Sequence, residues 1–302
     1  KLDSFDQGWH RENINSILIC QYHRIGDVFL IAPVLRSLKK RYPQAHIILL
    51  CCQGAEKLSL DLKFADEVIG VEVPWTNWDW SLIKWIKARS FARHFRNRDI
   101  DIAIDFKGDL RNSWFLWHVR SKMSLGYTDT GGSFFYTHPQ PSPTGVHQTE
   151  RSLQLISHLG CDSIMLDEKE FNFKDQGAIV LHAGGTDPRR AWPENKWIKL
   201  AEILSKNHEI AIVKTPETAI LIQRMKEREV RVKIFDGDLV KFKNWLRNQK
   251  MLIGNDSMPG HLAAYLGMPT ISIFGSQDPK MTCPIGKWIT IIKPDESCEH
   301  TR

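Results

Sequence analysis

The chain has 302 residues, of which 42% are hydrophobic and 25% charged, and these fractions are typical of a folded globular protein. This length is enough for two domains of ordinary size. No apolar run approaches the roughly 18 residues of a membrane-spanning helix, and residues 1–15 lack the apolar core of a secretion signal. We therefore expect a cytoplasmic protein.

The formal net charge of +6 suits an anionic partner, whether a nucleotide, an acidic glycan, a membrane surface or a nucleic acid, without selecting one. The six cysteines form no CxxC pair and no regular series. Cys20, Cys51 and Cys52 fall in or beside apolar runs, where a thiol behaves as a small buried hydrophobic group. We expect reduced, structural cysteines.

Apolar, β-rich runs alternate with helical patterns for most of the chain. In the first half we expect strands at residues 14–20, 46–52, 67–73 and 100–106, and helices at 28–41, 81–98 and 148–159. In the second half we expect strands at 178–182, 209–213, 231–235, 251–254 and 270–274, and helices at 194–206, 217–228, 239–248 and 261–266. Residues 128–145, rich in Gly, Pro, Ser and Thr, are expected to form a loop, and the polar residues 161–176 a linker.

This β-α-β alternation predicts an α/β protein with mostly parallel sheets covered by helices on both faces. Two successive alternations joined by the polar linker predict two similar domains, over residues 1–165 and 166–302. Ligands bind beyond the carboxyl ends of the strands in such sheets, so two facing domains would place a cleft there.

Residues 254–275, GNDSMPGHLAAYLGMPTISIFG, have the pattern of a strand end, a loop, a helix and a second strand. Asp256 and Ser257 suit the N-cap of the helix, where free N–H groups and the helix dipole form an anion site. Gly267 suits the end of the helix, ahead of Pro269. The alternative is an ordinary connection without a ligand.

A second loop, LHAGGTDPRRAWPENKW over residues 181–197, also has features that suit a phosphate group. Gly184 and Gly185 allow a ligand to approach the backbone closely. Arg189 and Arg190 can bind phosphate oxygens in bidentate fashion. A solvated basic loop is the alternative, but two such loops in one domain support each other.

The third loop, within residues 23–43, follows the first expected strand. Gly26 supplies a turn, and Asp27 lies near the first turn of a helix, where a carboxylate also stabilises the helix dipole. Neither GxGxxG nor GxxxxGK[ST] occurs in the chain, so a dinucleotide dehydrogenase is poorly supported and a P-loop NTPase is excluded.

Together with DFKGDLRNSWFLW and GYTDTGG in the middle of the chain, these three segments resemble, in order and spacing, glycosyltransferase family 9. This family comprises the heptosyltransferases of lipopolysaccharide core synthesis, and the resemblance covers nearly the whole chain. It implies a GT-B fold, in which two Rossmann-like domains face an interdomain cleft. The first domain would bind the acceptor and the second the nucleotide-sugar, and the last residues can pack back on the first domain.

The resemblance places Asp27 at the position of the catalytic base. Arg190 stands where the family has Lys or Arg facing the donor diphosphate. Glu217 resembles the acidic residue that binds the nucleotide ribose. Gly184 and Gly185 occupy positions that often carry Thr or Ser, so only backbone contacts with phosphate are expected there.

Asp256, Ser257 and His261 match the donor-binding pattern D-[ST]-G-x-x-H of the family, but Met258 replaces its Gly. A side chain at this position can reshape the donor pocket. The residues expected to bind the donor are Gly184, Gly185, Arg189, Arg190, Glu217, Asp256, Ser257, Met258 and His261.

Transfer with inversion needs a base at the acceptor hydroxyl and stabilisation of the departing diphosphate. Asp27 would supply the base, while Arg190 and the amides near Ser257 would neutralise the leaving group, so no metal and no cofactor are expected. Residues 236–238 spell DxD, which holds a divalent ion in other glycosyltransferases. They follow a strand and precede a helix, and the chain has no HExxH or similar ligand spacing, so we assign no metal site.

An acceptor made of acidic sugars and phosphates calls for cations in the N-terminal domain. The candidates, each with a solvated surface charge as the alternative, are Arg24, Lys107, Arg111 and Arg120, with Thr130, Gly131 and Gly132 in a loop that borders the same cleft. Asp101 and Asp105 are expected to be charges at the ends of the strand 100–106, without a role in catalysis.

Residues 74–98 hold four tryptophans and, from Lys84 to Arg98, six Lys or Arg and no acid. An aromatic, basic helix can lie on an anionic membrane surface. The alternative is a packed surface helix whose tryptophans face inward.

The sequence therefore predicts a metal-independent inverting glycosyltransferase that moves a heptose from ADP-heptose to a lipid-linked, acidic, lipopolysaccharide core-type acceptor. It would act in the cytoplasm, with possible peripheral contact with the inner face of the membrane, and without a nucleic-acid partner. The alternatives are another nucleotide-sugar or acceptor on the same fold, a sugar-nucleotide epimerase, and a catalytically silent nucleotide- or membrane-binding protein.

Overall fold

The computed structural model describes residues 14–294, with gaps at 77–78, 165–176 and 186. Its contacts divide the chain into two compact units. The N-terminal unit contains residues 1–24, 33–144 and 151–164, and the C-terminal unit contains residues 25–32, 145–150 and 165–302. The expected packing of the last residues, 295–302, and most of the expected linker lie outside the described residues. The division of functions at 165/166 stays a prediction.

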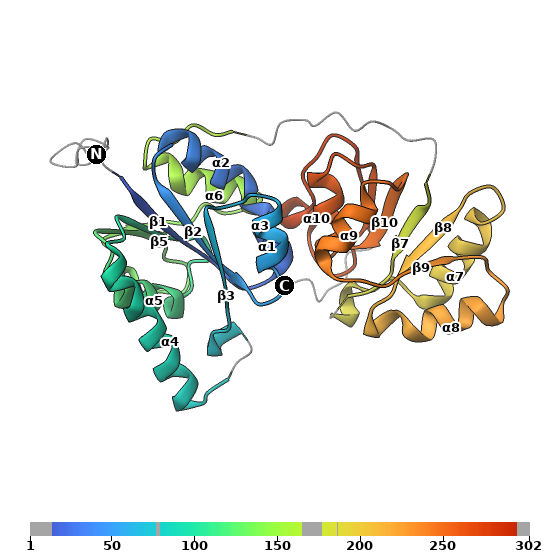
Figure 1. Cartoon of the computed structure of the whole chain (residues 1–302), viewed down its shortest axis with the longest axis horizontal. Helices are drawn as coiled ribbons and strands as arrows, with labels where there is room; N and C mark the ends of the chain where they lie inside the picture. The colour runs from blue at the N-terminus through green and yellow to red at the C-terminus, as the bar shows by residue number, and fades with distance from the viewer. Residues whose placement is uncertain (1–13, 77–78, 165–176, 186, 295–302) are drawn as a thin grey trace. The chain divides into compact units, whose positions relative to one another are not determined.

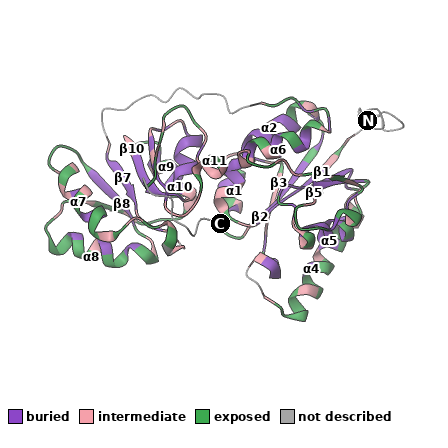
Figure 2. Cartoon of the chain, turned by 180° about the vertical axis from the view of Figure 1, so that it is seen from behind, coloured by how far each residue is buried: buried purple, intermediate pink, exposed green. Residues whose placement is uncertain are grey.

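The N-terminal unit is built on a six-stranded parallel sheet with the order β3-β2-β1-β4-β5-β6. Its central strands are purple in Figure 2 because helices cover both faces, with α2 and α6 on one and α4 and α5 on the other (Figure 1). The strands are β1 (Ser16–Gln21), β2 (His46–Cys52), β3 (Glu67–Val71), β4 (Ile102–Asp105), β5 (Met123–Tyr127) and β6 (His138–Gln140). The helices are α2 (Ala32–Arg41), α3 (Glu56–Asp61), α4 (Leu82–His94), α5 (Leu110–Val119) and α6 (Gln148–Ser157).

The C-terminal unit repeats this plan with a second six-stranded parallel sheet, ordered β12-β11-β10-β7-β8-β9. On one face, Trp197, Ile198, Leu221 and Met225 of α7 and α8 pack into a buried core with the strands. The strands are β7 (Ile179–His182), β8 (Ile210–Val213), β9 (Lys233–Phe235), β10 (Met251–Asn255), β11 (Thr270–Ile273) and β12 (Ile289–Ile292). The helices are α1 (Ile25–Leu30), α7 (Glu194–Leu204), α8 (Ala219–Glu227), α9 (Leu239–Leu246), α10 (Met258–Tyr265) and α11 (Pro279–Thr282).

Both sheets confirm the expected α/β architecture, and both have the strand order of a Rossmann fold, 3-2-1-4-5-6, counted within each unit. In this order the chain reverses its direction of winding between the first and fourth strands. The loops after those two strands diverge there and leave a crevice for ligands. In the N-terminal unit the two strands are β1 and β4, and in the C-terminal unit they are β7 and β10.

The prediction of one continuous helix over residues 28–41 was wrong. Residues 28–41 form two helices, α1 and α2, with a break at Ile31, and α1 belongs to the C-terminal unit. Pro33 explains the break, because proline has no N–H to bond the carbonyl four residues earlier and its ring crowds that carbonyl.

Several elements were not expected, above all β5, β6 and α5. Strand β6 lies within the Gly- and Pro-rich residues 128–145, which were expected to be loop only. It has three residues, with Pro139 in the middle, and proline is tolerated in a sheet only at an edge. The expected helix 81–98 is α4 followed by a 3-10 turn over Phe95–Arg98. Among the described helices, none combines the length and hydropathy that crossing a bilayer would require.

Candidate active site

The loops after β7 and β10 are tied together by one buried amide, Asn255 at the end of β10. Its Nδ2 donates to the Ala183 carbonyl at 2.8 Å, and its Oδ1 accepts the Trp192 N–H at 3.0 Å. Asn255 is 1% exposed, so these bonds are shielded from water. Because one side chain holds both ends of residues 183–192, the arginine loop is fixed at the carboxyl edge of the sheet.

The two arginines of this loop point to different partners. Arg189 donates from Nε and Nη2 to Asp187 at 3.0 and 2.9 Å, and its side chain is 74% exposed. This pairing lowers the pKa of Asp187 to about 2. Arg190 instead turns inward, where its Nη1 lies 3.1 Å from Oδ2 of Asp256, a carboxylate that is 3% exposed. Its Nε also lies 3.8 Å from Oδ2 of Asp187, so Asp187 is a shared but more distant partner. Asp256 therefore orients Arg190, and a guanidinium has N–H groups left over for a second anion.

At the end of β7, two residues predicted to bind the donor, Ser257 and Glu217, lie close to His182 and Thr215. The Ser257 hydroxyl donates to the Asn255 carbonyl at 3.0 Å and lies 3.4 Å from Nδ1 of His182. Burial lowers the pKa of His182 to about 4, so this imidazole is neutral near pH 7. A hydrogen bond with Thr215, followed by one with its own backbone N–H, holds the pKa of Glu217 below its usual range.

Gly184 is required by this packing, because a Cβ there would lie 2.8 Å from Oγ1 of Thr215. Gly185 has no atom within 4 Å of the position of its Cβ among the described residues, so its backbone is open on that side. The two glycines thus differ: the first packs against the β8 loop, and the second is free to be approached.

Helix α10 begins at Met258, directly after Ser257, with Pro259 in its first turn. Pro259 has no N–H, and the Gly260 N–H donates to the Ser257 carbonyl at 3.1 Å. Among the hydrogen bonds of the described residues, none is donated by the Met258 N–H. A side chain at this position therefore leaves in place the amide that the helix start offers to an anion.

Helix α1 packs against α10 within the C-terminal unit and brings Asp27 to this region. A Cβ on Gly26 would lie 3.3 Å from the His261 ring and 3.8 Å from Cα of Met258. The Phe29 and Tyr265 rings meet edge-on at 6.0 Å. Asp27 follows Gly26, lies in the first turn of α1 and is partly exposed. The structure thus brings the predicted base and the start of α10 together.

His261 is buried beneath this contact. Burial, and after it the nearby His147 and Arg190, lowers the pKa of His261 to about 4. A neutral His261 permits the tight approach of α1, since a charged ring would be costly to bury beside a guanidinium.

In the N-terminal unit, the corresponding edge is organised by Asp105, at the end of β4. This fully buried carboxylate accepts hydrogen bonds from Tyr136 (2.7 Å), from Asn112 (2.9 Å) and from the backbone N–H groups of Lys107 (3.0 Å) and Gly108 (3.1 Å). Burial raises its pKa, while the four donors oppose that rise. Asp105 is therefore not a simple charge at a strand end: it shapes the loop that starts α5.

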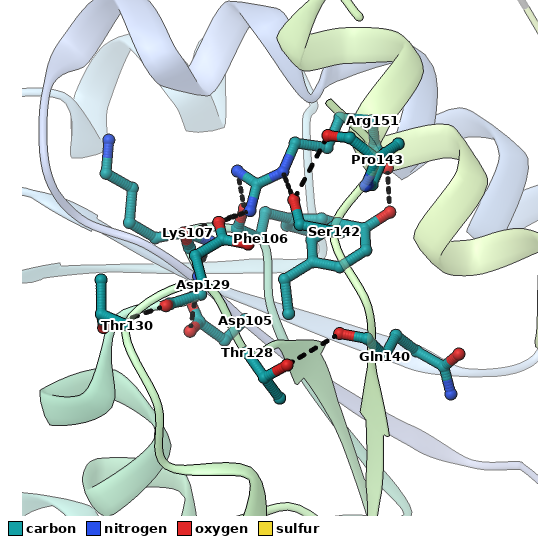
Figure 3. Close-up of polar contacts among 12 residues, drawn as sticks. Asp105, Phe106, Lys107, Thr128, Asp129, Thr130, Gln140, Ser142, Pro143 and Arg151 are labelled. Carbon is teal, nitrogen blue, oxygen red and sulfur yellow. Dashed lines mark hydrogen bonds and ion pairs between the residues drawn. The ribbon is translucent and has the colours of Figure 1, made fainter. Parts of the chain in front are cut away.

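Arg151 holds the neighbouring loop, as Figure 3 shows. Its guanidinium pairs with Asp129, donates to Ser142 at 2.8 Å and lies 4.5 Å above the Tyr127 ring. It also reaches the Phe106 and Lys107 carbonyls at 3.4 and 3.5 Å. The exposed Lys107 side chain points away from this cluster (Figure 3).

Most of the expected acceptor residues meet at this edge. Thr130 accepts the Leu110 N–H at 2.9 Å, which fixes the loop to the start of α5, and Gly132 is packed so closely that a Cβ would lie 2.3 Å from Oγ of Ser113. Burial, followed by Lys107 and then by Arg111 and Arg24 among other charges, lowers the pKa of His23 to about 4. These three cations therefore lie around His23, at the ends of β1 and β4.

Arg120 is not brought to this edge. It follows α5 with a positive φ of 62°, before β5 begins, and its guanidinium lies 5.4 Å from the Trp117 ring centre. The groups whose pKa it lowers are Arg96, in the turn after α4, and His118 of α5, and neither lies in the loops after β1 and β4.

The DxD residues have structural partners. Asp236 pairs with Lys214 at 2.6 Å, and Asp238 caps α9 by accepting the Lys241 N–H at 2.8 Å. Within residues 14–294, apart from the gaps given above, no three His, Cys, Asp or Glu side chains form a group that suits a metal ion. The described cysteines, Cys20, Cys51, Cys52, Cys161 and Cys283, are free thiols. Cys298 lies outside the described residues.

A sequence model of glycosyltransferase family 9 (heptosyltransferase) matches residues 88–302, which is more than half of the chain. The chain belongs to glycosyltransferase family 9. It is 23% identical to lipopolysaccharide heptosyltransferase 1 of Pseudomonas aeruginosa, over 93% of this chain and 84% of that protein.

Solved structures of this family have the same fold. A family 9 glycosyltransferase from Veillonella parvula aligns with a TM-score of 0.79 at 19% identity, over 94% of this chain and 87% of that one. The heptosyltransferase WaaC of E. coli, solved with ADP-2-deoxy-2-fluoro heptose, aligns with a TM-score of 0.75 at 21% identity, over 91% and 92% of the two chains. The fold is GT-B, and the protein is a glycosyltransferase.

Several residues that shape this family 9 site were missed by sequence reasoning, among them Asn255, His182, Asp105 and Arg151. Asn255, His182 and Asp105 are the last residues of β10, β7 and β4, and that position was the available signal. Arg151 lies within α6, and no comparable signal marked it. Gly275 was also missed: a Cβ there would lie 2.5 Å from the Arg189 carbonyl, so it keeps the arginine loop close to β11.

Proposed function

We propose that this glycosyltransferase moves a heptose from ADP-heptose to a lipopolysaccharide core-type acceptor, with inversion at the anomeric carbon. Family membership and the relative from Pseudomonas aeruginosa support heptose transfer. The observation that carries the residue assignment is the packing of α1 on α10, which places Asp27 beside the start of the helix that follows β10.

For the donor, Arg190 and the amide of Met258 would bind the diphosphate, aided by the positive end of the α10 dipole. Asp256 would hold Arg190 in place rather than touch the donor itself, because its carboxylate is nearly inaccessible. Glu217, which is ionised and lies at the end of β8, would accept hydrogen bonds from the ribose hydroxyls. The open backbone at Gly185 would line the same pocket.

In the reaction, Asp27 would accept the proton of the acceptor hydroxyl as its oxygen attacks the anomeric carbon. The bond between that carbon and the diphosphate oxygen breaks on the opposite face, and ADP leaves. Arg190 and the helix start would neutralise the charge that develops on the leaving oxygen, and one such donor is worth about 10²–10³ in rate. We therefore assign the neutralisation of the leaving group to the chain's own cation and amides.

For the acceptor, we propose Lys107, Arg111 and Arg24, whose charges surround His23 in the N-terminal unit. Arg111 is already paired with Asp109, with Nε at 2.8 Å from Oδ1, so Lys107 and the exposed Arg24 are freer to bind phosphate. Thr130, Gly131 and Gly132 would border the acceptor.

An Asp27→Asn substitution tests the base. General-base catalysis contributes about 10²–10⁴ in rate, so turnover of ADP-heptose should fall by at least about 100-fold, with ADP binding retained within a few-fold. Asp236→Asn, which removes another carboxylate of the same unit that pairs with Lys214, is the matched control and should leave most of the activity. Unchanged turnover of the Asp27 variant would remove it from the base position.

The donor is tested by thermal shift with ADP-, UDP-, GDP- and dTDP-sugars. We expect ADP-heptose to raise the unfolding temperature most. A larger shift with another nucleotide-sugar would point to the rival donor, and interconversion of a free UDP-sugar without transfer would indicate an epimerase.

A lipid-linked acceptor would place the enzyme at the inner face of the cytoplasmic membrane. Its partners would then be a nucleotide-sugar, an acidic glycolipid and the membrane surface, without nucleic acid.

A further inference from the structure

The first two turns of α4 and the residues just before them expose a group of large apolar side chains. Trp80, Leu82, Ile83 and Ile86 are 75%, 73%, 66% and 57% exposed. They lie on the outward side of α4, because the opposite side carries Ala88 and Ala92, which are buried in the core of the unit. We call these four residues the apolar tip.

The other tryptophans of the segment are accounted for by packing. Trp75 is buried and its Nε1 donates to Asn112 at 2.8 Å. Trp85 is half-buried and packs against Trp75 and Trp114, with ring centres 5.2 and 5.5 Å apart. Trp78 lies outside the described residues. Among the described tryptophans of the segment, the exposed one is thus Trp80, and the apolar tip is otherwise aliphatic.

Next to the apolar tip lies a cluster of four arginines: Arg89, Arg93, Arg96 and Arg120. They are close enough that Arg89, Arg93 and Arg120 all help to lower the pKa of Arg96, after its partial desolvation. All four also add to the effect of burial in lowering the pKa of His118 to about 4. Helix α4 packs directly on α5, whose C-terminal end carries Arg120.

Across the described residues, none of these four arginines forms an ion pair with a carboxylate. The Arg96 Nε donates to the His118 carbonyl at 2.9 Å, which fixes one cation in place. Lys84, by contrast, is held by Asp79 at 2.7 Å and Glu72 at 3.7 Å, so it adds little to the cluster. Four cations that repel one another without local compensation are costly unless an anionic partner neutralises them.

We infer that the apolar tip of α4 and the arginine cluster behind it form a docking surface for a bilayer that contains anionic phospholipid. Aliphatic side chains at the end of a helix enter the acyl boundary, and arginines one and two turns further along bind the headgroup phosphates. This pairing of aliphatic tip and cations distinguishes a bilayer from other anionic partners. A nucleic acid would match the arginines but leave Leu82, Ile83 and Ile86 without a counterpart.

The inference deepens the proposed function by naming the membrane partner, and it reassigns Arg120 from the acceptor to the lipid headgroups. Binding to vesicles is measured without any reaction, so it succeeds or fails independently of heptose transfer. A chain that binds vesicles but transfers no heptose would overturn only the proposed function.

The test uses flotation with vesicles of phosphatidylcholine, with and without phosphatidylglycerol. We expect the wild-type chain to bind the mixed vesicles and to lose most of this binding at high salt. Arg89→Gln with Arg93→Gln should weaken binding at least about tenfold, as should Ile83→Ser with Ile86→Ser, since charge and burial both contribute.

Matched controls come from the C-terminal unit. Arg224→Gln with Arg228→Gln removes two exposed cations, and Ile203→Ser with Ile220→Ser removes two exposed isoleucines. Neither control should change vesicle binding. Both α4 variants should keep the wild-type unfolding temperature and the turnover of a lipid-free acceptor fragment.

Absence of binding to the mixed vesicles, or equal binding by the α4 variants, would overturn the inference. Tighter binding of a duplex DNA fragment than of the vesicles, lost in the arginine variant, would overturn lipid as the partner.

Discussion

At the scale of single residues, the site separates two adjacent arginines that look alike in the sequence. Arg189 is exposed and occupied by Asp187, whereas Arg190 is held inward by the buried Asp256. The sequence identifies the pair as suited to phosphate. It could not assign their directions, because these depend on which carboxylate each one meets in the folded chain.

Arg190→Ala should lower kcat by about 10²–10³, because it removes a preorganised cation from the departing diphosphate. Arg189→Ala, the matched control, should cost less than about threefold. Steady-state kinetics with varied ADP-heptose would decide. Equal losses in the two variants would contradict the division of roles.

Met258 raises a separate question, since the family pattern has Gly at this position. Met258→Gly should change the ADP dissociation constant by less than about threefold, because the N–H of residue 258 is present with either side chain. The unfolding temperature should fall slightly, since glycine in a helix costs up to about 1 kcal/mol. Calorimetric titration with ADP measures the first effect. A change of tenfold or more would show that the Met258 side chain reshapes the pocket.

At the scale of elements, Asp105 links four structural pieces through one carboxylate. It bonds Tyr136 beyond β5, Asn112 of α5 and the 107–108 backbone, while Asn112 also accepts from Tyr22 at 2.9 Å. The buried Asp105 carboxylate therefore fixes the conformation of the loop that carries Lys107.

Asp105→Asn should raise the KM for the acceptor and leave the KM for ADP-heptose unchanged, because it replaces an acceptor of four hydrogen bonds by a partial donor. It should also reduce stability by about 1–3 kcal/mol, the cost of unsatisfied buried groups. Asp101→Asn is the control: Asp101 is also buried, but it bonds Asn15, Ser16 and Lys122 before the start of β4. It should lower stability without changing either KM. An Asp105 variant with the same kinetic profile as the Asp101 variant would reduce its role to stability.

The elements show how far the sequence reaches. Hydrophobic runs such as 46–52 and 178–182 predict the central strands within a residue or two, because buried parallel strands are continuously apolar. Strand β5, MSLGY, was missed since it mixes Ser and Gly with apolar residues, and β6 since three residues leave no periodicity. The break between α1 and α2 was missed although Pro33 marks it. The chain's contacts alone show that α1 belongs with the C-terminal unit.

At the scale of the whole molecule, the same strand order occurs twice, and each copy carries two histidines that are neutral near pH 7. Burial is the main cause that lowers the pKa of each of them to about 4. They are His23 and His118 in the N-terminal unit, and His182 and His261 in the C-terminal unit.

These histidines predict a loss of stability in acid. The unfolded chain takes up their protons near the ordinary pKa of about 6.5, whereas the folded chain takes them up only near 4. Stability is therefore greatest above pH 6.5 and falls as the pH drops toward 4, with each histidine adding up to about 1.4 kcal/mol per pH unit. Unfolding temperatures measured from pH 7.5 to about 4.5 should show this fall.

His118→Gln should make the decline shallower, because it removes one of the four protonation steps. His118 is the suitable choice, as it lies outside the proposed donor and acceptor residues. A decline as steep as in the wild type would show that His118 takes up its proton at the same pH in the folded and the unfolded chain.

The outer strands of the two sheets have a consequence for how the chain behaves at high concentration. An unpaired strand edge is a template for another copy of the chain, and long apolar edges lead to aggregates. Here β6 and β9 are three residues long, β6 has Pro139 at its centre with no N–H to offer, and β9 begins with the exposed Lys233. At these two edges newly made chains should therefore resist joining while they fold, whereas the opposite edges, β3 and β12, are longer and more apolar.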